Sequence, residues 1–292
     1  MPEKPSGFCG LEKPFSDYEC ARYAVLPAPY ERTTSYGKGT SKGPNAIIEA
    51  SRYLELYDEE LDATPAETGI ATLKPLAVDG RQPNAMAHAI RKAVAVLLGD
   101  GKIPVVLGGE HSITPAAVDA VAECFGDVSV LQFDAHSDLR EEYHGNRHSH
   151  ACAMARSREH ADTVHVGIRS LGAEEAPLVK RLRAEGKLYF ATDVIGKDRV
   201  MDIVGALKDR VYVTFDVDAF DPSIMPSTGT PEPGGLGWYD VLGILRGVCR
   251  ERAVVGFDIM ELSPNPGNKA PDFTAAKLAY KMIGYSTVGR HP

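Results

Sequence analysis

The chain has 292 residues and a net charge of −8, and 43% of its residues are hydrophobic. An acidic balance disfavours nucleic acid as a partner, because phosphates need a basic face. No apolar run reaches the ~20 residues that a membrane helix needs, so no membrane association is expected. The polar start of the sequence lacks the regions of a signal peptide, which predicts a cytoplasmic protein. Five scattered cysteines without a CxxC pair predict free thiols.

Residues 1–20 show little periodicity and are expected to form an N-terminal arm. Short apolar runs then alternate with longer helical patterns. The expected strands are 23–26, 103–107, 128–133, 164–168, 188–190, 211–215 and 254–259. The expected helices are 44–57, 84–98, 114–124, 173–185, 238–249 and 272–283. Several of the strands are apolar at every position, which is typical of strands that are covered on both faces.

This alternation of strands and helices predicts a parallel sheet with helices on both faces. No linker, repeat or low-complexity tract divides the sequence, so a single three-layer α/β domain over residues 1–292 is the simplest interpretation. In such sheets, ligands bind beyond the carboxyl ends of the strands. Functional residues are therefore expected directly after the apolar runs.

Polar motifs follow four of the expected strands. They are GGEHS at 108–112, DAHSD at 134–138, DVDAFDP at 216–222 and MELSP at 260–264. Residues two apart in an extended segment point the same way, so each motif can present several ligands in one direction. The candidate metal ligands are His111, Asp134, His136, Asp138, Asp216 and Asp218.

The charge of these candidates argues for bound cations. Four aspartates in a water-poor cleft repel one another strongly unless cations neutralise them. Mixed carboxylate and imidazole ligands without thiolate suit Mn²⁺, with Zn²⁺, Ni²⁺, Co²⁺ or Fe²⁺ as alternatives. Two such metals can lower the pKa of a shared water and provide a nucleophile at neutral pH. A lone Asp-x-Asp pair is common in turns, but several clusters after separate strands together predict two divalent cations.

These motifs resemble the signatures of the ureohydrolases, the arginase/agmatinase family. The resemblance rests on GGEHS, DAHSD, FDVDAFDPS at 215–223 and DIMELSP at 258–264, with further similarity over 35–51. It extends from about 23 to 283. It implies a three-layer αβα sandwich with a central parallel eight-stranded sheet, assembled as a homotrimer or homohexamer. It also implies two Mn²⁺ per subunit and a small guanidino substrate from which urea is cut.

The resemblance also implies a role for each residue. The ligands that match one manganese are His111, Asp134, Asp138 and Asp216, and those that match the other are Asp134, His136, Asp216 and Asp218, so that Asp134 and Asp216 bridge. Glu261 matches the carboxylate that receives the guanidinium group. His150 matches the catalytic histidine, which would protonate the departing amine. His144 and His148 lie in the same segment and remain alternatives to His150.

The chain resembles agmatinase more than arginase, because TGTPEPGG at 228–235 looks like the Gly/Pro-rich loop of agmatinases. Pro226-Ser227 stands where that loop usually reads Pro-Gly. Agmatine is therefore the expected substrate, hydrolysed to putrescine and urea in polyamine biosynthesis. N1-aminopropylagmatine and guanidinobutyrate remain alternatives. So do a single-zinc, deacetylase-like hydrolase and a metal-binding protein without catalysis.

Overall fold

Eight parallel strands form one sheet in the computed structural model, which describes residues 6–78 and 82–289. The strand order is β2-β1-β3-β8-β7-β4-β5-β6. The strands are β1 (Tyr23–Ala28), β2 (Ile70–Thr72), β3 (Ile103–Gly108), β4 (Val128–Phe133), β5 (Asp162–Ile168), β6 (Leu188–Phe190), β7 (Arg210–Asp216) and β8 (Ala253–Met260). This sheet confirms the predicted fold class, and the single domain over residues 1–292 stays a prediction.

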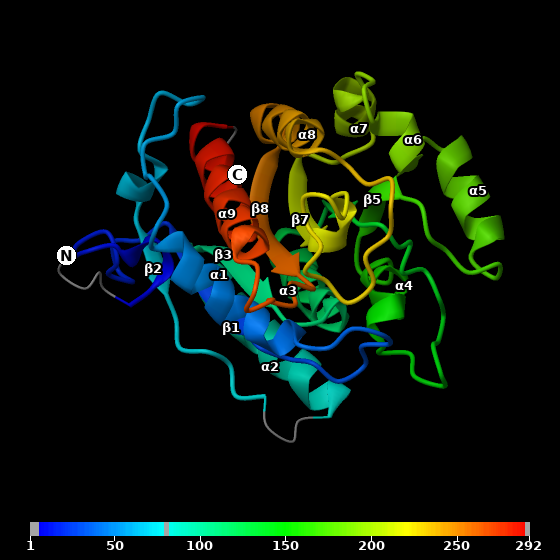
Figure 1. Cartoon of the computed structure of the whole chain (residues 1–292), viewed down its shortest axis with the longest axis horizontal. Coiled ribbons are helices and arrows are strands. Elements are labelled where there is room, and N and C mark those ends of the chain that lie inside the picture. The colour runs from blue at the N-terminus through cyan, green and yellow to red at the C-terminus, as the bar shows by residue number, and fades with distance from the viewer. Residues whose placement is uncertain (1–5, 79–81, 290–292) are drawn as a thin grey trace.

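Helices cover both faces of the sheet, which gives the three layers of an αβα sandwich (Figure 1). The helices are α1 (Gly43–Ser51), α2 (Pro83–Gly99), α3 (Thr114–Phe125), α4 (Ala153–Ser157), α5 (Ala176–Ala184), α6 (Ala191–Val194), α7 (Val200–Gly205), α8 (Trp238–Glu251) and α9 (Ala270–Val288). One layer contains α1, α7, α8 and α9, and the other contains α2 to α5. Among the described helices, none has the length and apolar composition that crossing a membrane requires.

The strands are apolar at every position because both of their faces are buried. Val25 packs into one hydrophobic core, and the next residue, Leu26, packs into the other. Val105 and Val106 in β3 divide in the same way. Successive side chains of a strand point to opposite faces, so a strand between two helical layers needs apolar residues throughout.

The structure differs from the sequence prediction mainly in short elements. β2 was not predicted, because a three-residue strand at the sheet edge carries too little pattern to recognise. The short helices α4, α6 and α7 were also missed. The predicted helix 44–57 ends at Ser51, whose hydroxyl donates to the carbonyl of Ile48 and accepts from the backbone amide of Cys9. These local bonds replace the helical pattern at that point.

The predicted arm packs against the rest of the chain where it is described. Residues 1–5 lie outside the described residues. Phe8 and Cys9 are buried, and the backbone amide of Phe8 donates to Thr72 in β2. None of the five cysteines, all of which lie in the described residues, forms a disulfide, in agreement with the prediction.

Candidate metal centre

Polar side chains gather where four neighbouring strands end. β3, β8, β7 and β4 lie side by side in that order and run in the same direction. His111 follows β3, Asp134 follows β4, Asp216 ends β7 and Glu261 follows β8. The four predicted motifs therefore meet at one edge of the sheet, as expected for the carboxyl ends of parallel strands.

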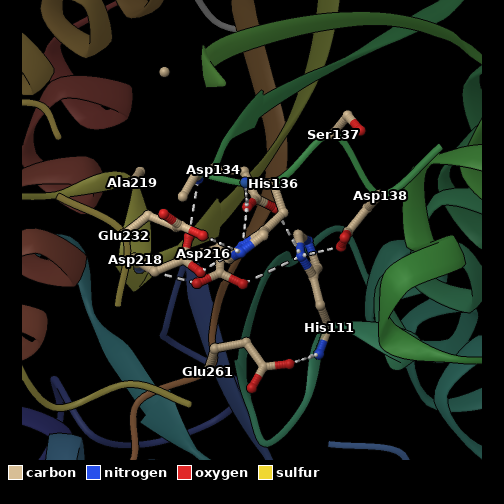
Figure 2. Close-up of polar contacts among 12 residues, drawn as sticks. His111, Asp134, His136, Ser137, Asp138, Asp216, Asp218, Ala219, Glu232 and Glu261 are labelled. Carbon is tan, nitrogen blue, oxygen red and sulfur yellow. Dashed lines mark hydrogen bonds and ion pairs between the residues drawn. The ribbon is translucent and has the colours of Figure 1, made fainter. Parts of the chain in front are cut away.

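The first group of candidate ligands surrounds the ring of His111 (Figure 2). Its Nδ1 atom lies 3.1 Å from Asp134 Oδ2, 3.3 Å from Asp138 Oδ2 and 3.4 Å from Asp216 Oδ2. All four residues are buried. Three carboxylates therefore converge on a single imidazole nitrogen, which is the arrangement that one bound cation would need.

The second nitrogen of His111 explains how the ring is oriented. Nε2 lies 2.8 Å from Thr214 Oγ1, and the Thr214 hydroxyl donates to Asp258 Oδ1 at 2.6 Å. Because this hydroxyl hydrogen points to Asp258, Thr214 accepts a hydrogen bond from Nε2–H. In the neutral ring, Nδ1 therefore carries a lone pair, and this buried atom has no hydrogen-bond partner. Such an atom fits a metal ligand. We name Asp258, Thr214 and His111 the Asp258 relay.

The second group consists of Asp134, His136 and Asp218. His136 Nδ1 lies 2.9 Å from Asp218 Oδ2 and 3.7 Å from Asp134 Oδ1. Asp134 thus belongs to both groups, as expected for a bridging carboxylate. Asp216 belongs only to the first group, and its Oδ1 accepts the backbone amide of Asp218 at 2.9 Å. The bridging role of Asp216 stays a prediction.

The electrostatics of the cluster support bound cations. Burial and nearby carboxylates raise the pKa of Asp216 and of Glu261 well above the usual range. Burial lowers the pKa of His136, but Asp218 and Asp134 outweigh it and raise the pKa to about 12. Without cations, the cluster would therefore hold extra protons on carboxylates and imidazoles. Divalent cations displace such protons, so this donor set fits two metals.

Two of the predicted site residues have an uncommon backbone conformation. Asp138 and Glu261 have φ angles of 51° and 65°, in the left-handed region. Non-glycine residues rarely adopt it, and they do so mainly where the surrounding structure holds them. The carbonyl of Asp138 accepts the backbone amides of Met154 and Ala155, each at 3.0 Å. The amide of Glu261 donates to Gly109 at 2.9 Å.

A cavity of about 210 Å³ opens next to the cluster. Residues 34–37 and 229–230 form part of its wall, where the amide of Gly37 donates to the carbonyl of Gly229 at 3.0 Å. The predicted site residues that line it are His111, His136, Asp138, His150, Asp216, Asp218 and Glu261. Asp134 lies fully buried behind them. The candidate ligands other than Asp134 therefore border the same cavity as His150 and Glu261, the two residues expected to act on the substrate.

The other two histidines of the 139–150 segment lie elsewhere. His148 lines a neighbouring cavity, and His144 is exposed and packs on Tyr143, with ring centroids 4.2 Å apart. Only His150, of these three, borders the cavity beside the metal ligands. This position favours His150 over the two alternatives.

Ser227, where agmatinases usually have glycine, is buried and lies outside the left-handed region, so its side chain needs no unusual backbone.

Sequence reasoning missed a row of polar residues behind Asp134, which begins at the half-buried Arg158 and is otherwise buried. Arg158 Nη1 donates to Thr163 Oγ1 at 2.9 Å, and Thr163 Oγ1 lies 2.8 Å from His165 Nε2. His165 Nδ1 lies 2.5 Å from Gln132 Oε1, and Gln132 Nε2 donates to Asp134 Oδ2 at 2.7 Å. Burial and the charge of Arg158 lower the pKa of His165 to about 3, so its ring is neutral. We name these five residues the Arg158 relay.

Two charged residues that were not assigned a role hold the surrounding loops. Buried Glu175 accepts the hydroxyl of Ser137 at 2.6 Å and the amide of Leu139 at 2.8 Å. Figure 2 shows Ser137 pointing away from the cluster. Arg169 donates to the carbonyls of Asp218 at 2.7 Å and of Glu232 at 2.8 Å. Both residues thus fix the segments that carry the candidate ligands.

Comparison with known proteins identifies the family. The chain matches the arginase family model over residues 21–284. N(1)-aminopropylagmatine ureohydrolase of Synechocystis is 40% identical over 279 residues, which cover 92% of this chain and 90% of the relative. Agmatinase of Pyrococcus horikoshii is 37% identical over 282 residues, which cover 94% and 96%.

A solved structure agrees with these relatives. The agmatine ureohydrolase of Thermoplasma volcanium superposes with a TM-score of 0.83 at 34% identity, covering 92% of this chain and 91% of that one. Fold, motifs and relatives therefore lead to the same conclusion. This chain belongs to the arginase family and is a ureohydrolase, an enzyme that hydrolyses guanidino carbon–nitrogen bonds.

Proposed function

We propose that this ureohydrolase acts on N1-aminopropylagmatine and releases urea and the corresponding triamine. The observation that carries the proposal is the sequence identity of this chain to relatives that are named for this substrate. Enzymes named for this substrate from Synechocystis and Thermus thermophilus are 40% and 42% identical to this chain, whereas the Pyrococcus agmatinase is 37% identical. Agmatine, the substrate that the sequence motifs favour, is the second candidate.

Two divalent cations complete the proposed site. The residues that would hold them are His111, Asp134, Asp138 and Asp216 for one, and Asp134, His136, Asp216 and Asp218 for the other. When bound, the cations supply Lewis-acid stabilisation and a nucleophile from water at neutral pH. The ligand set suits Mn²⁺ first. Six ligands exceed the three that a single catalytic zinc uses, which argues against the deacetylase-like alternative.

Glu261 is the proposed anchor for the guanidinium group. Its Oε1 atom accepts the backbone amide of His111 at 2.7 Å, and its carboxylate lines the cavity. A carboxylate can hold a planar guanidinium through paired, charge-assisted hydrogen bonds. A bound guanidinium would lower the raised pKa of Glu261, since an opposite charge favours the ionised form of the carboxyl group.

His150 is the proposed proton donor to the departing amine. Its half-buried ring stands in the cavity wall, and Tyr143 packs against it with ring centroids 6.0 Å apart. The amine must leave with a proton, because a free amide anion is far too basic. A histidine can supply that proton near neutral pH.

The test is urea release from N1-aminopropylagmatine, agmatine, guanidinobutyrate and arginine, with the protein preloaded with Mn²⁺. We expect kcat/KM for N1-aminopropylagmatine to exceed that for agmatine by about 10-fold, which corresponds to about 1.4 kcal/mol. Equal or better turnover of agmatine would instead favour agmatinase. No urea with Mn²⁺, Ni²⁺, Co²⁺ or Zn²⁺ would reject the proposal and favour a non-catalytic metal protein.

Metal content and assembly can be measured on the same sample. We expect two metals per chain, where the single-zinc alternative requires one. The homotrimer or homohexamer, the cytoplasmic location and the place in polyamine biosynthesis stay predictions that follow from the family resemblance.

A further inference from the structure

A buried carboxylate lies behind His150, outside the set of candidate metal ligands. Glu110 follows β3 and is fully buried, and its backbone amide donates to the carbonyl of Tyr30. Its Oε2 atom accepts the backbone amides of Arg32 and Thr33. Its Oε1 atom accepts two hydroxyls, from Thr33 at 2.8 Å and from Ser112. Four donors thus surround Glu110, and each of them points its hydrogen at the carboxylate.

Thr33 connects this carboxylate to His150. Besides donating to Glu110, its oxygen accepts the backbone amide of His150 at 2.9 Å and lies 3.2 Å from His150 Nδ1. A threonine hydroxyl has one hydrogen to donate and two lone pairs that accept. Since the hydrogen is directed at Glu110, the oxygen can only accept from the imidazole. Nδ1 must then carry a hydrogen.

We propose that Glu110, acting through Thr33, holds His150 in the tautomer that carries its hydrogen on Nδ1. This leaves Nε2, on the opposite side of the ring, as the atom that exchanges a proton in the cavity. Glu110 and Thr33 are then positioning residues. The consequence for turnover rests on the proposed function of His150, whereas the tautomer itself does not.

Ser149 is the competing partner of the same nitrogen, because its Oγ atom lies 3.3 Å from His150 Nδ1. A serine hydroxyl can donate or accept, so it fits either tautomer. Thr33 does not have this freedom. If Nδ1 carried a lone pair, that lone pair would face a lone pair of Thr33 at 3.2 Å. With hydrogen on Nδ1, both hydroxyls accept, so Thr33 decides the tautomer.

The sharpest test is Glu110→Gln, which keeps the shape of the side chain. Two backbone amides point at Oε2, so the glutamine must place its carbonyl oxygen there and its NH₂ group toward Thr33. Thr33 would then accept from the amide and turn its hydrogen to His150. The variant therefore reverses the tautomer. Thr33→Val removes the hydroxyl without reversing the tautomer of His150. This second variant replaces Glu110→Gln in the test if Glu110→Gln does not fold.

The direct measurement is the imidazole ¹⁵N spectrum of histidine-labelled protein loaded with diamagnetic Zn²⁺, with His150→Asn to assign the signal. We expect hydrogen on Nδ1 in the unmodified protein, hydrogen on Nε2 in Glu110→Gln, and a mixture in Thr33→Val. Thr33→Ser and Ser149→Ala should keep hydrogen on Nδ1. Hydrogen on Nε2 in the unmodified protein, or no change in Glu110→Gln, would overturn the inference.

Kinetics with Mn²⁺ separate this inference from the proposed function. We expect Glu110→Gln and Thr33→Val to lower kcat by about 10-fold or more, within the range of general acid–base effects, with KM and metal content unchanged. Thr33→Ser should restore kcat, and Ser149→Ala should not affect it. If the unmodified protein releases no urea, the proposed function fails while the spectrum still tests the tautomer. If urea is released but Glu110→Gln keeps full kcat, the inference fails alone.

Discussion

Two rows of polar side chains reach the candidate metal ligands from different strands, and their hydrogen bonds run in opposite directions. In the Asp258 relay, from β8 and β7, hydrogens point away from the cluster, toward the carboxylate of Asp258. In the Arg158 relay, from β5 and β4, hydrogens point toward the cluster and end on Asp134. The Asp258 relay thus ends on the carboxylate of Asp258, and the Arg158 relay begins at the guanidinium of Arg158.

The difference follows from the ligand that each relay supports. A histidine ligand must keep a lone pair on one nitrogen, so its other N–H needs an acceptor behind it. A carboxylate ligand has lone pairs in excess, so it needs a donor to fix its orientation. Asp258 and Arg158 supply the charges that set these two directions. The polarity of each relay can therefore be derived from the chemistry of the ligand at its end.

The largest effect is expected for Asp134→Asn, at the end of the Arg158 relay. Asp134 belongs to both ligand groups, and a neutral amide cannot balance two cations. We expect both metals to be lost and kcat/KM to fall at least about 1,000-fold, since the metals contribute several kcal/mol to the transition state. Elemental analysis after gel filtration checks the metal content, with the exposed Glu142→Gln as control. Two metals and full rate would remove Asp134 from the centre.

Glu261→Gln sharpens the comparison, because the Glu261 carboxylate bonds to no side chain of either relay and accepts only the backbone amide of His111. We expect both metals to stay bound while kcat/KM falls about 100-fold, the loss expected for a charge-assisted contact. Metal analysis and steady-state kinetics on one preparation distinguish this outcome from that of Asp134→Asn. Loss of metal here would make Glu261 part of the metal centre.

Thr214→Val interrupts the Asp258 relay and leaves every candidate metal ligand unchanged in the sequence. The N–H of His111 loses its acceptor, and the ring loses the contact that orients it. We expect metal affinity to fall about 10- to 100-fold, as for other partners of metal-binding histidines. Competition with a chelator measures the change, and Thr214→Ser should reverse it. An unchanged affinity would mean that the relay has no influence on His111.

His165→Gln tests the Arg158 relay through the pH dependence of stability. The pKa of His165 is lowered to about 3, below the value of about 6.5 in an unfolded chain. The unfolded chain therefore binds more protons as pH falls below 6.5, and the folded state loses stability. We expect the metal-free protein to lose about 2 kcal/mol more than the variant between pH 6.5 and 5.0. Urea unfolding at both pH values measures it, and equal losses would contradict a neutral, buried His165.

The sequence predicted the layers of the fold and the meeting of four motifs, because long apolar runs and polar residues after them carry strong patterns. It missed the edge strand β2 and the short helices, whose patterns are too brief. Both relays were also missed, since buried polar residues inside apolar runs look like exceptions. A signal was nevertheless present. Gln132 and Thr214 each lie two residues before a ligand, Asp134 and Asp216, and so share its side of the strand.

Patterns at strand ends were not sufficient to predict the substrate or to choose among the three histidines of the 139–150 segment. The TGTPEPGG motif favoured agmatine, while the relatives favour its aminopropyl derivative. Substrate length depends on the shape of loops, which motifs at strand ends do not describe. The family resemblance favoured His150 over His144 and His148, and only His150, of these three, borders the cavity beside the candidate ligands.

The left-handed backbone at Asp138 and Glu261 has a consequence for how this protein can evolve. Such a conformation costs a non-glycine residue about 1 kcal/mol or more, and glycine adopts it freely. A change to glycine at either position would relax the main chain and remove a functional side chain at the same time. Selection for stability alone would therefore favour losing these carboxylates, and their proposed roles in metal and guanidinium binding are what selection for turnover would keep. Under the proposed roles, these two positions are where folding stability and activity trade against each other.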